Sequence, residues 1–93
     1  MARIAPRVHT DAASIDRLKE LQQALDAQLV ATLQLRDGSI VSGTIPERPA
    51  LQQFFGPDGD EGMNGLLLLD VDGEGRRMLW LDDVVDFSRI GSA

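Results

Sequence analysis

The sequence contains no cysteine, which excludes disulfide bonds, cysteine-based zinc sites and thiol nucleophiles. Its single histidine, His9, lies near the start of the chain and has no predicted metal partner. No apolar stretch is long enough for a signal peptide or a membrane-spanning helix, so we expect a cytoplasmic protein that binds no membrane. Because Ser39, Ser42 and Ser88 have no evident activating base, we also expect a non-enzyme without metal or cofactor.

Positive charge is scarce and unevenly placed. Nine Lys and Arg residues against fifteen Asp and Glu residues give a net charge of -6, which repels phosphate backbones at long range. Residues 1–9 nevertheless hold Arg3, Arg7 and His9 and no acid. They predict a flexible basic arm, or alternatively an arm that docks on an acidic partner or a neighbouring subunit. Residues 10–90 are enough for one small domain, for which oligomerisation would supplement a limited core.

The first regular element is an amphipathic helix, predicted over residues 11–28. Thr10 or Asp11 can accept a hydrogen bond from the free amides of the first turn. Apolar side chains then recur at helical spacing, at Ile15, Leu18, Leu21, Leu25 and Leu29. The polar face is not rich in Lys and Arg, so this helix is expected to cover the core.

From residue 29 the apolar period changes from helical to alternating. This pattern predicts strands at 29–36 and 39–45, joined at Asp37-Gly38 by a type I′ hairpin turn. Gly43 interrupts the second strand, where a glycine permits the sharp bend that a small barrel needs. These three residues are therefore assigned to turn and bend.

The remaining chain predicts a long loop and three more strands. Residues 46–62 are rich in Pro, Gly and acid and read as an acidic loop, with a short helical turn at Leu51, Phe54 and Phe55. Strands are predicted at 65–71, 76–81 and 84–88. One helix followed by five short strands indicates a mainly β domain, a strongly bent antiparallel barrel.

These residues resemble the Sm-like (LSm) superfamily, as a divergent bacterial member. Residues 30–45, "VATLQLRDGSIVSGTI", match its first motif of alternating apolar residues, a charged residue, Asp-Gly and a glycine-bearing strand. Met63-Asn64 is similar to the pair that enters the third strand, and residues 79–84 fit the spacing of the second motif. The chain has Trp80-Leu81 where the superfamily has the Arg-Gly of its uridine pocket.

The resemblance implies RNA binding, and each candidate residue also has a structural alternative. Asn64 matches the base-contacting asparagine, or is a turn residue. Trp80 could stack on a base, or supply buried area in the core or an interface. Arg76 and Arg77 could contact phosphate, or be solvated surface residues.

These features suggest two main functions and one further hypothesis. The first is a non-enzymatic oligomeric binding module, with RNA as its first candidate ligand. The alternative is a protein-interaction or scaffold module that binds no nucleic acid, which the negative charge and the missing Arg-Gly favour. Met78, Leu79 and Leu81, from a strand that is apolar on both faces, are the predicted oligomer interface. A small-ligand pocket near Trp80 and the Phe54-Phe55 loop is a third hypothesis.

Overall fold

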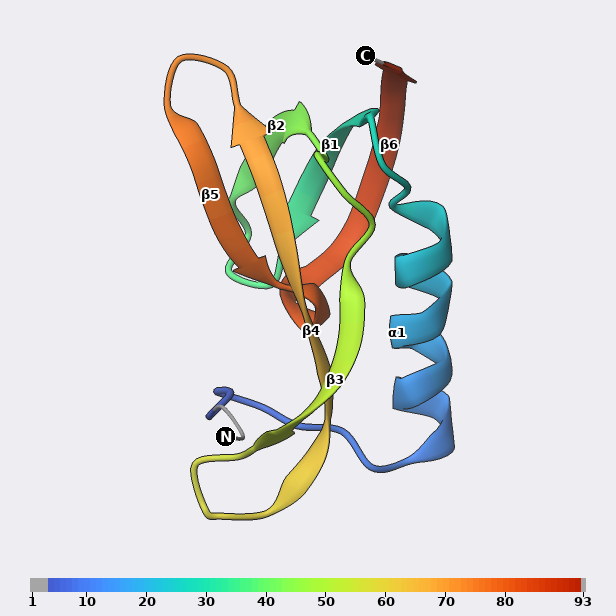
Figure 1. Cartoon of the computed structure of the whole chain (residues 1–93), viewed down its shortest axis with the longest axis vertical. Helices are drawn as coiled ribbons and strands as arrows, with labels where there is room; N and C mark the ends of the chain where they lie inside the picture. The colour runs from blue at the N-terminus through green and yellow to red at the C-terminus, as the bar shows by residue number, and fades with distance from the viewer. Residues whose placement is uncertain (1–3, 93) are drawn as a thin grey trace.

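The computed structural model describes residues 4–92 as a curled antiparallel sheet with one helix packed against it (Figure 1). Within these residues the elements are α1 (Ala12–Ala24), β1 (Leu29–Leu35), β2 (Ile40–Thr44), β3 (Ala50–Phe55), β4 (Glu61–Val71), β5 (Gly75–Trp80), the 3₁₀ helix η1 (Leu81–Asp83) and β6 (Val84–Ser92). The predicted fold class is confirmed. The sheet is a half-barrel, and its described part has six strands, one more than expected.

The helix begins as predicted and ends early. Asp11 caps it, because the Ser14 amide donates to the Asp11 carboxylate over 2.9 Å. It ends at Ala24 rather than at residue 28, because Gln28 adopts a left-handed φ of 67° and donates its amide to Ile45 O. The chain thereby turns from α1 directly into β1.

The β1–β2 turn is wider than the predicted type I′ turn. The Gly38 amide donates to Leu35 O, and the Leu35 amide donates to Ser39 O. Gly38 has a φ of 89°, whereas Asp37 is not among the residues with positive φ. The connection is therefore a three-residue loop that needs one left-handed residue, supplied by Gly38.

The prediction of one long loop over residues 46–62 is wrong from residue 50 onward, where two strands and a short turn replace it. Residues 50–55 form β3 instead of a helical turn, and β4 already begins at Glu61. The two strands pair from Ala50↔Leu66 to Phe55↔Glu61, which satisfies the backbone that a helical turn would have satisfied locally. Between them Gly59, with a φ of 84°, makes the same kind of turn as Gly38.

The sheet divides along β4. Leu66 pairs with Ala50 of β3 on one edge and with Trp80 of β5 on the other. The path runs β3-β4-β2-β1-β6, so β2 and β3 share one edge of β4 as two parts of one bent ribbon. The predicted role of Gly43 needs refinement: a Cβ there would lie 2.4 Å from Asp70 O, so Gly43 permits close approach of β4 to β2.

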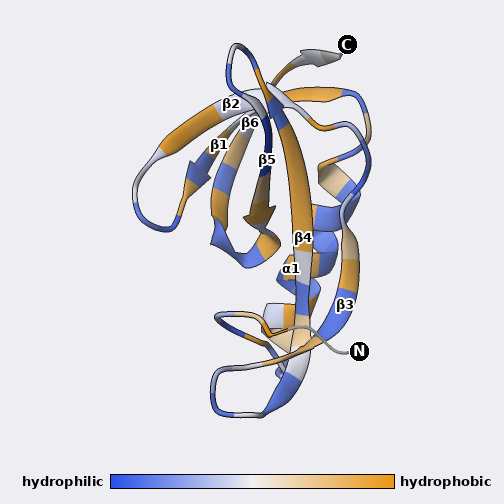
Figure 2. Cartoon of the chain, turned by 60° about the vertical axis from the view of Figure 1, so that its left-hand side comes forward, coloured by the Kyte–Doolittle hydropathy of each residue, from blue (hydrophilic) through white to orange (hydrophobic). Residues whose placement is uncertain are grey.

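The core lies between α1 and the concave face of the sheet. Leu18, Leu21 and Leu25 of the helix are buried against apolar residues of β1, β4, η1 and β6. Figure 2 shows that β4 is hydrophobic over its C-terminal half, where Leu67 and Leu69 are fully buried. This packing is the main source of stability for a short chain.

Residues 4–9 form an ordered segment, which we call the N-terminal strap. The predicted flexible arm is wrong for these residues, while Arg3 lies outside the described residues. Ala5 is fully buried and donates its amide to Phe55 O, and the backbones of His9 and Met63 exchange two hydrogen bonds of 3.0 and 2.8 Å. A Cβ on Gly62 would lie 2.9 Å from the His9 backbone, so this glycine makes room for the strap.

Candidate functional site

Asp82 in η1 is the centre of a buried polar cluster. Arg7 Nε donates to Asp82 Oδ2 over 2.9 Å, and His9 Nε2 lies 2.9 Å from the same oxygen. The Asp82 side chain is only 4% exposed, whereas that of Arg7 is 37% and that of His9 21% exposed. The carboxylate therefore fastens the N-terminal strap to η1 from inside the protein.

Arg36 and Asp83 extend this cluster towards the surface. The Arg36 side chain donates through Nη2 to Asp82 O over 2.9 Å, and its amide donates to Asp83 O over 2.7 Å. The Asp83 carboxylate accepts from Arg7 Nη2 and lies 3.7 Å from Arg36 Nε. Three segments far apart in sequence, the strap, the β1–β2 turn and η1, therefore meet here.

The charge states of the cluster follow from these contacts. Burial alone would raise the pKa of Asp82, but hydrogen bonds from Arg7 and His9 outweigh it and lower the pKa below its ordinary 3.8. The hydrogen bond to Asp82 likewise raises the pKa of Arg7. Asp82 is therefore a carboxylate at neutral pH, and its negative charge is matched by the strap.

Asn64 is fully buried and acts as a structural link in this conformation. Its Nδ2 donates to Arg7 O over 2.9 Å, and its Oδ1 accepts from the amides of Gly65 and Asp82. Every amide atom is thus used within the chain, and no face of the side chain is exposed to a base. Asn64 therefore matches a base-contacting asparagine in sequence, but its side chain is not accessible to a base.

The other predicted nucleic-acid residues do not converge with Asn64. Trp80 is half-buried and packs edge-on against Phe54, with ring centroids 5.2 Å apart. Of the small-ligand pocket expected there, the structure has a hollow of about 130 Å³ beside Phe54 and Phe55, and Trp80 does not line it. Arg76 and Arg77 lie four and three positions before Trp80 on β5, which is about 13 and 10 Å along a strand. Arg76 bonds Asp70, and Arg77 is exposed.

The three predicted interface residues divide between core and surface. Leu81 is fully buried and Leu79 is 8% exposed, and both belong to the main core. Met78 is 59% exposed on β5. The C-terminal end of β5 is apolar on both faces because Leu79 packs in the core and Trp80 packs on Phe54. Of the three residues, only Met78 is accessible for an interface.

Sequence reasoning missed the cluster itself. Arg7 and Asp82 are 75 positions apart, and Asp82-Asp83 read only as a break between strands. Within residues 4–92 no three His, Asp or Glu side chains converge as a metal site would require. In the same part of the chain no helix has the length and apolar content to cross a bilayer.

Comparisons with known proteins bear on the fold and not on an activity. A family model described as "Domain of unknown function (DUF3247)" matches residues 2–90. None of the curated proteins matches the chain. The crystal structure of XC5848 from Xanthomonas campestris, described as adopting a novel variant of the Sm-like motif, superposes with a TM-score of 0.91. It is 31% identical, and the match covers 98% of this chain and 100% of that one.

The resemblance to the Sm-like superfamily is thereby confirmed. Both the family model and the structural match include the strap and β3, two ordered segments that were not predicted from the sequence. This chain belongs to the DUF3247 family, a domain family of unknown function whose fold is a variant of the Sm-like motif.

Proposed function

We propose that this chain is a non-enzymatic binding module that joins other protein chains by strand addition, in the first place a second copy of itself. In the described part of the chain three strands have a single strand partner, and two of them, β5 and β6, supply the supporting observation; the third, β3, is bordered at Phe55 by the strap. β5 pairs with β4, and β6 pairs with β1, and neither has another strand partner within residues 4–92. An open edge presents unpaired backbone groups that another strand can satisfy.

Exposed apolar side chains accompany both edges. Met78 on β5 borders a groove of about 350 Å³, in which Leu66 and Leu68 of β4 are half-buried. On β6, Ile90 is 62% and Val85 is 42% exposed. Because the two edges are different surfaces, joining β5 of one copy to β6 of the next would give a head-to-tail assembly, closed into a ring or open.

A protein partner is favoured over RNA because the residues at the positions of the superfamily's base pocket are occupied by contacts within the chain. Asn64, which matches the base-contacting asparagine of the superfamily, is fully buried, and its side-chain amide donates a hydrogen bond to Arg7 O. Leu81, in place of the glycine, is a core residue, and Trp80, in place of the arginine, packs on Phe54. The net charge of -6 further opposes phosphate binding.

The self-association proposal predicts a concentration-dependent mass above that of the monomer. Light scattering coupled to size exclusion measures it at micromolar concentrations. Met78→Lys should return the protein to a monomer, because a charge on an exposed edge opposes strand addition. Gln34→Lys is the control: Gln34 is exposed, but it lies on β1 and is paired on both sides, with Ile40 of β2 and Asp86 of β6. A wild-type protein that stays monomeric would refute the proposal.

RNA binding is kept as a second candidate because of one cationic groove. Arg7, Arg36 and Arg77 line a pocket of about 380 Å³, with Asp37 and Asp83 beside them. The lining has three arginines and two carboxylates, and Arg7 also pairs with the buried Asp82 carboxylate, so little net positive charge is left for phosphate. Phosphate contacts there would be weak and strongly dependent on salt.

This second candidate predicts a salt-dependent shift of short RNAs. An electrophoretic assay with A-rich and U-rich oligonucleotides at two salt concentrations should show binding that weakens with salt, because phosphate contacts release counterions. Arg77→Gln should reduce both the affinity and the salt slope, while Arg89→Gln, outside the groove, should change neither. RNA binding whose affinity does not change with salt concentration, or no RNA binding at low salt, would exclude this function.

A further inference from the structure

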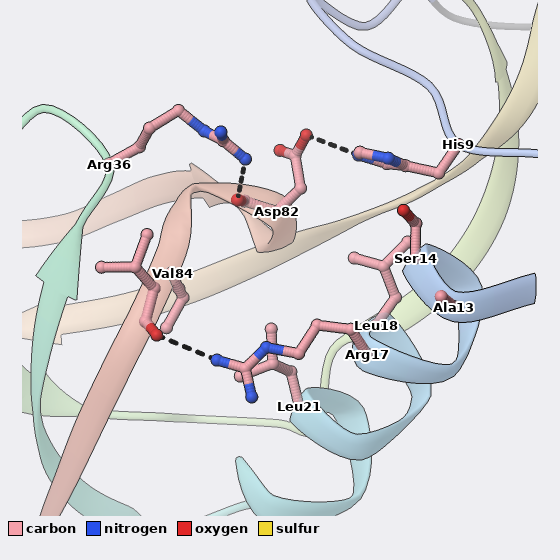
Figure 3. A pocket seen from close by; sticks show the side chains of 10 residues that line it. His9, Ala13, Ser14, Arg17, Leu18, Leu21, Arg36, Asp82 and Val84 are labelled. Carbon is pink, nitrogen blue, oxygen red and sulfur yellow. Dashed lines mark hydrogen bonds and ion pairs between the residues drawn. The ribbon is translucent and has the colours of Figure 1, made fainter. Parts of the chain in front are cut away.

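A pocket of about 390 Å³ lies between the first turns of α1 and the start of β6 (Figure 3). We call it the α1–β6 pocket. Its apolar floor is formed by Leu18 and Leu21 of α1 and by Val84 of β6. This volume falls in the range of about 300–1,000 Å³ that holds small molecules. Its composition therefore decides what kind of molecule it suits.

Three basic side chains reach this pocket from three different elements. Arg17 comes from α1, Arg36 from the β1–β2 turn and His9 from the strap. Arg17 Nη2 donates to Val85 O and Arg36 Nη2 donates to Asp82 O, each over 2.9 Å. These bonds hold the guanidinium groups in place, and each group has five N–H donors, so further donors remain for a ligand.

The one carboxylate in the lining does not oppose an anion. The Asp82 side chain is 4% exposed and its oxygens accept from Arg7 and His9. Figure 3 shows this carboxylate directed towards His9, with Arg36 at its backbone oxygen and Arg17 across the pocket. Arg7 and Arg36 together balance the carboxylates of Asp82 and Asp83, and Arg17 supplies the further positive charge of the pocket.

We propose that the α1–β6 pocket binds a small organic anion. Its carboxylate or phosphate group would accept hydrogen bonds from Arg17 and Arg36, which suit planar and tetrahedral oxyanions alike. Its apolar part would lie on Leu18, Leu21 and Val84. The inference is argued from side chains of α1 and the β1–β2 turn and needs no added strand, although Val85 of β6 lines the pocket and also belongs to the β6 edge.

Titration of isotope-labelled protein with three simple probes tests the proposal. Benzoate and phenyl phosphate carry the two candidate head groups on an aromatic body, and benzyl alcohol is a neutral control. We expect saturable amide shifts at Ser14, Arg17 and Val85 with at least one anion, and the tighter anion identifies the head group. Absence of saturable shifts at these amides up to millimolar concentrations, or equally tight binding of benzyl alcohol, would overturn the proposal.

A matched pair of helix variants tests the role of the guanidinium. Arg17→Gln should weaken binding of the preferred anion at least about tenfold, the loss expected for a charged hydrogen bond. Lys19→Gln removes the same charge from an exposed site on the same helix outside the pocket, and should leave the affinity unchanged. Arg17 is exposed, so both variants should fold. Equal affinities for wild type and Arg17→Gln would refute the assignment.

Discussion

Gly43→Ala is expected to destabilise the protein by about 3 kcal/mol, the upper end of the range for overpacked sites. A Cβ at this position would lie 2.4 Å from Asp70 O and 3.0 Å from Asp70 C. Both neighbours are backbone atoms of β4, so no side chain can turn aside to relieve the clash. β2 and β4 pair here only through Thr44↔Asp70, and separating them would open the sheet at this point.

Urea denaturation followed by the fluorescence of Trp80 measures this effect. Gly91→Ala is the matched control, because Gly91 also lies in a strand, has no positive φ, and a Cβ there would meet no atom within 4 Å. Its free energy of unfolding should stay within about 0.5 kcal/mol of wild type. Equal stabilities for the two variants would show that β2 and β4 do not approach as closely as described.

The helix, five of the six strands and the glycine turn at Gly38 were predictable from the sequence because each has a local signal. The alternation after residue 29 and the Asp37-Gly38 turn are properties of neighbouring residues. β3 was missed because half of its residues are exposed and its buried residue, Phe54, has no alternating apolar neighbours. Asp58-Gly59 carries the same turn signal as Asp37-Gly38, and it was the clue to this hairpin.

The site was less predictable, because it depends on contacts between distant segments. Nothing near Arg7 indicates that it bonds Asp82, and Asn64 has the identity of a ligand-binding residue without its exposure. A motif predicts which residue occupies a position in a fold. Whether that residue faces solvent depends on what covers it, and here the strap covers it.

This covering explains how one scaffold can lose a superfamily pocket and keep its shape. The strap pairs with Met63 along the edge of β4 that β5 leaves free, and its Arg7 backbone takes the donor of Asn64. The residues that would otherwise face a ligand thereby become part of the protein interior. The binding surfaces that we propose lie elsewhere, at the open edges and beside α1.

Asp82→Ala is expected to cost about 2–3 kcal/mol of stability. Removing one partner of a fully buried ion pair costs about 3–5 kcal/mol. The value should be lower here because the Arg7 side chain is 37% exposed and can be hydrated after the loss. The strap should also loosen, so trypsin should cleave after Arg7 faster in the variant than in wild type. Asp72→Ala, at an exposed turn, is the control for both measurements.

The same carboxylate predicts how stability depends on pH. Because the folded pKa of Asp82 is lowered, its contribution is complete above the unfolded value of 3.8 and is lost as pH falls through the folded pKa. Hydrogen bonds from Ser14 and Ser39 also lower the pKa of Asp11 and Asp37, so Asp82→Asn should retain part of the acid destabilisation and Asp72→Asn all of it. Urea midpoints from neutral pH to about pH 2 measure the difference. If Asp82→Asn loses as much stability on acidification as wild type, the carboxylate is not what holds the strap to η1.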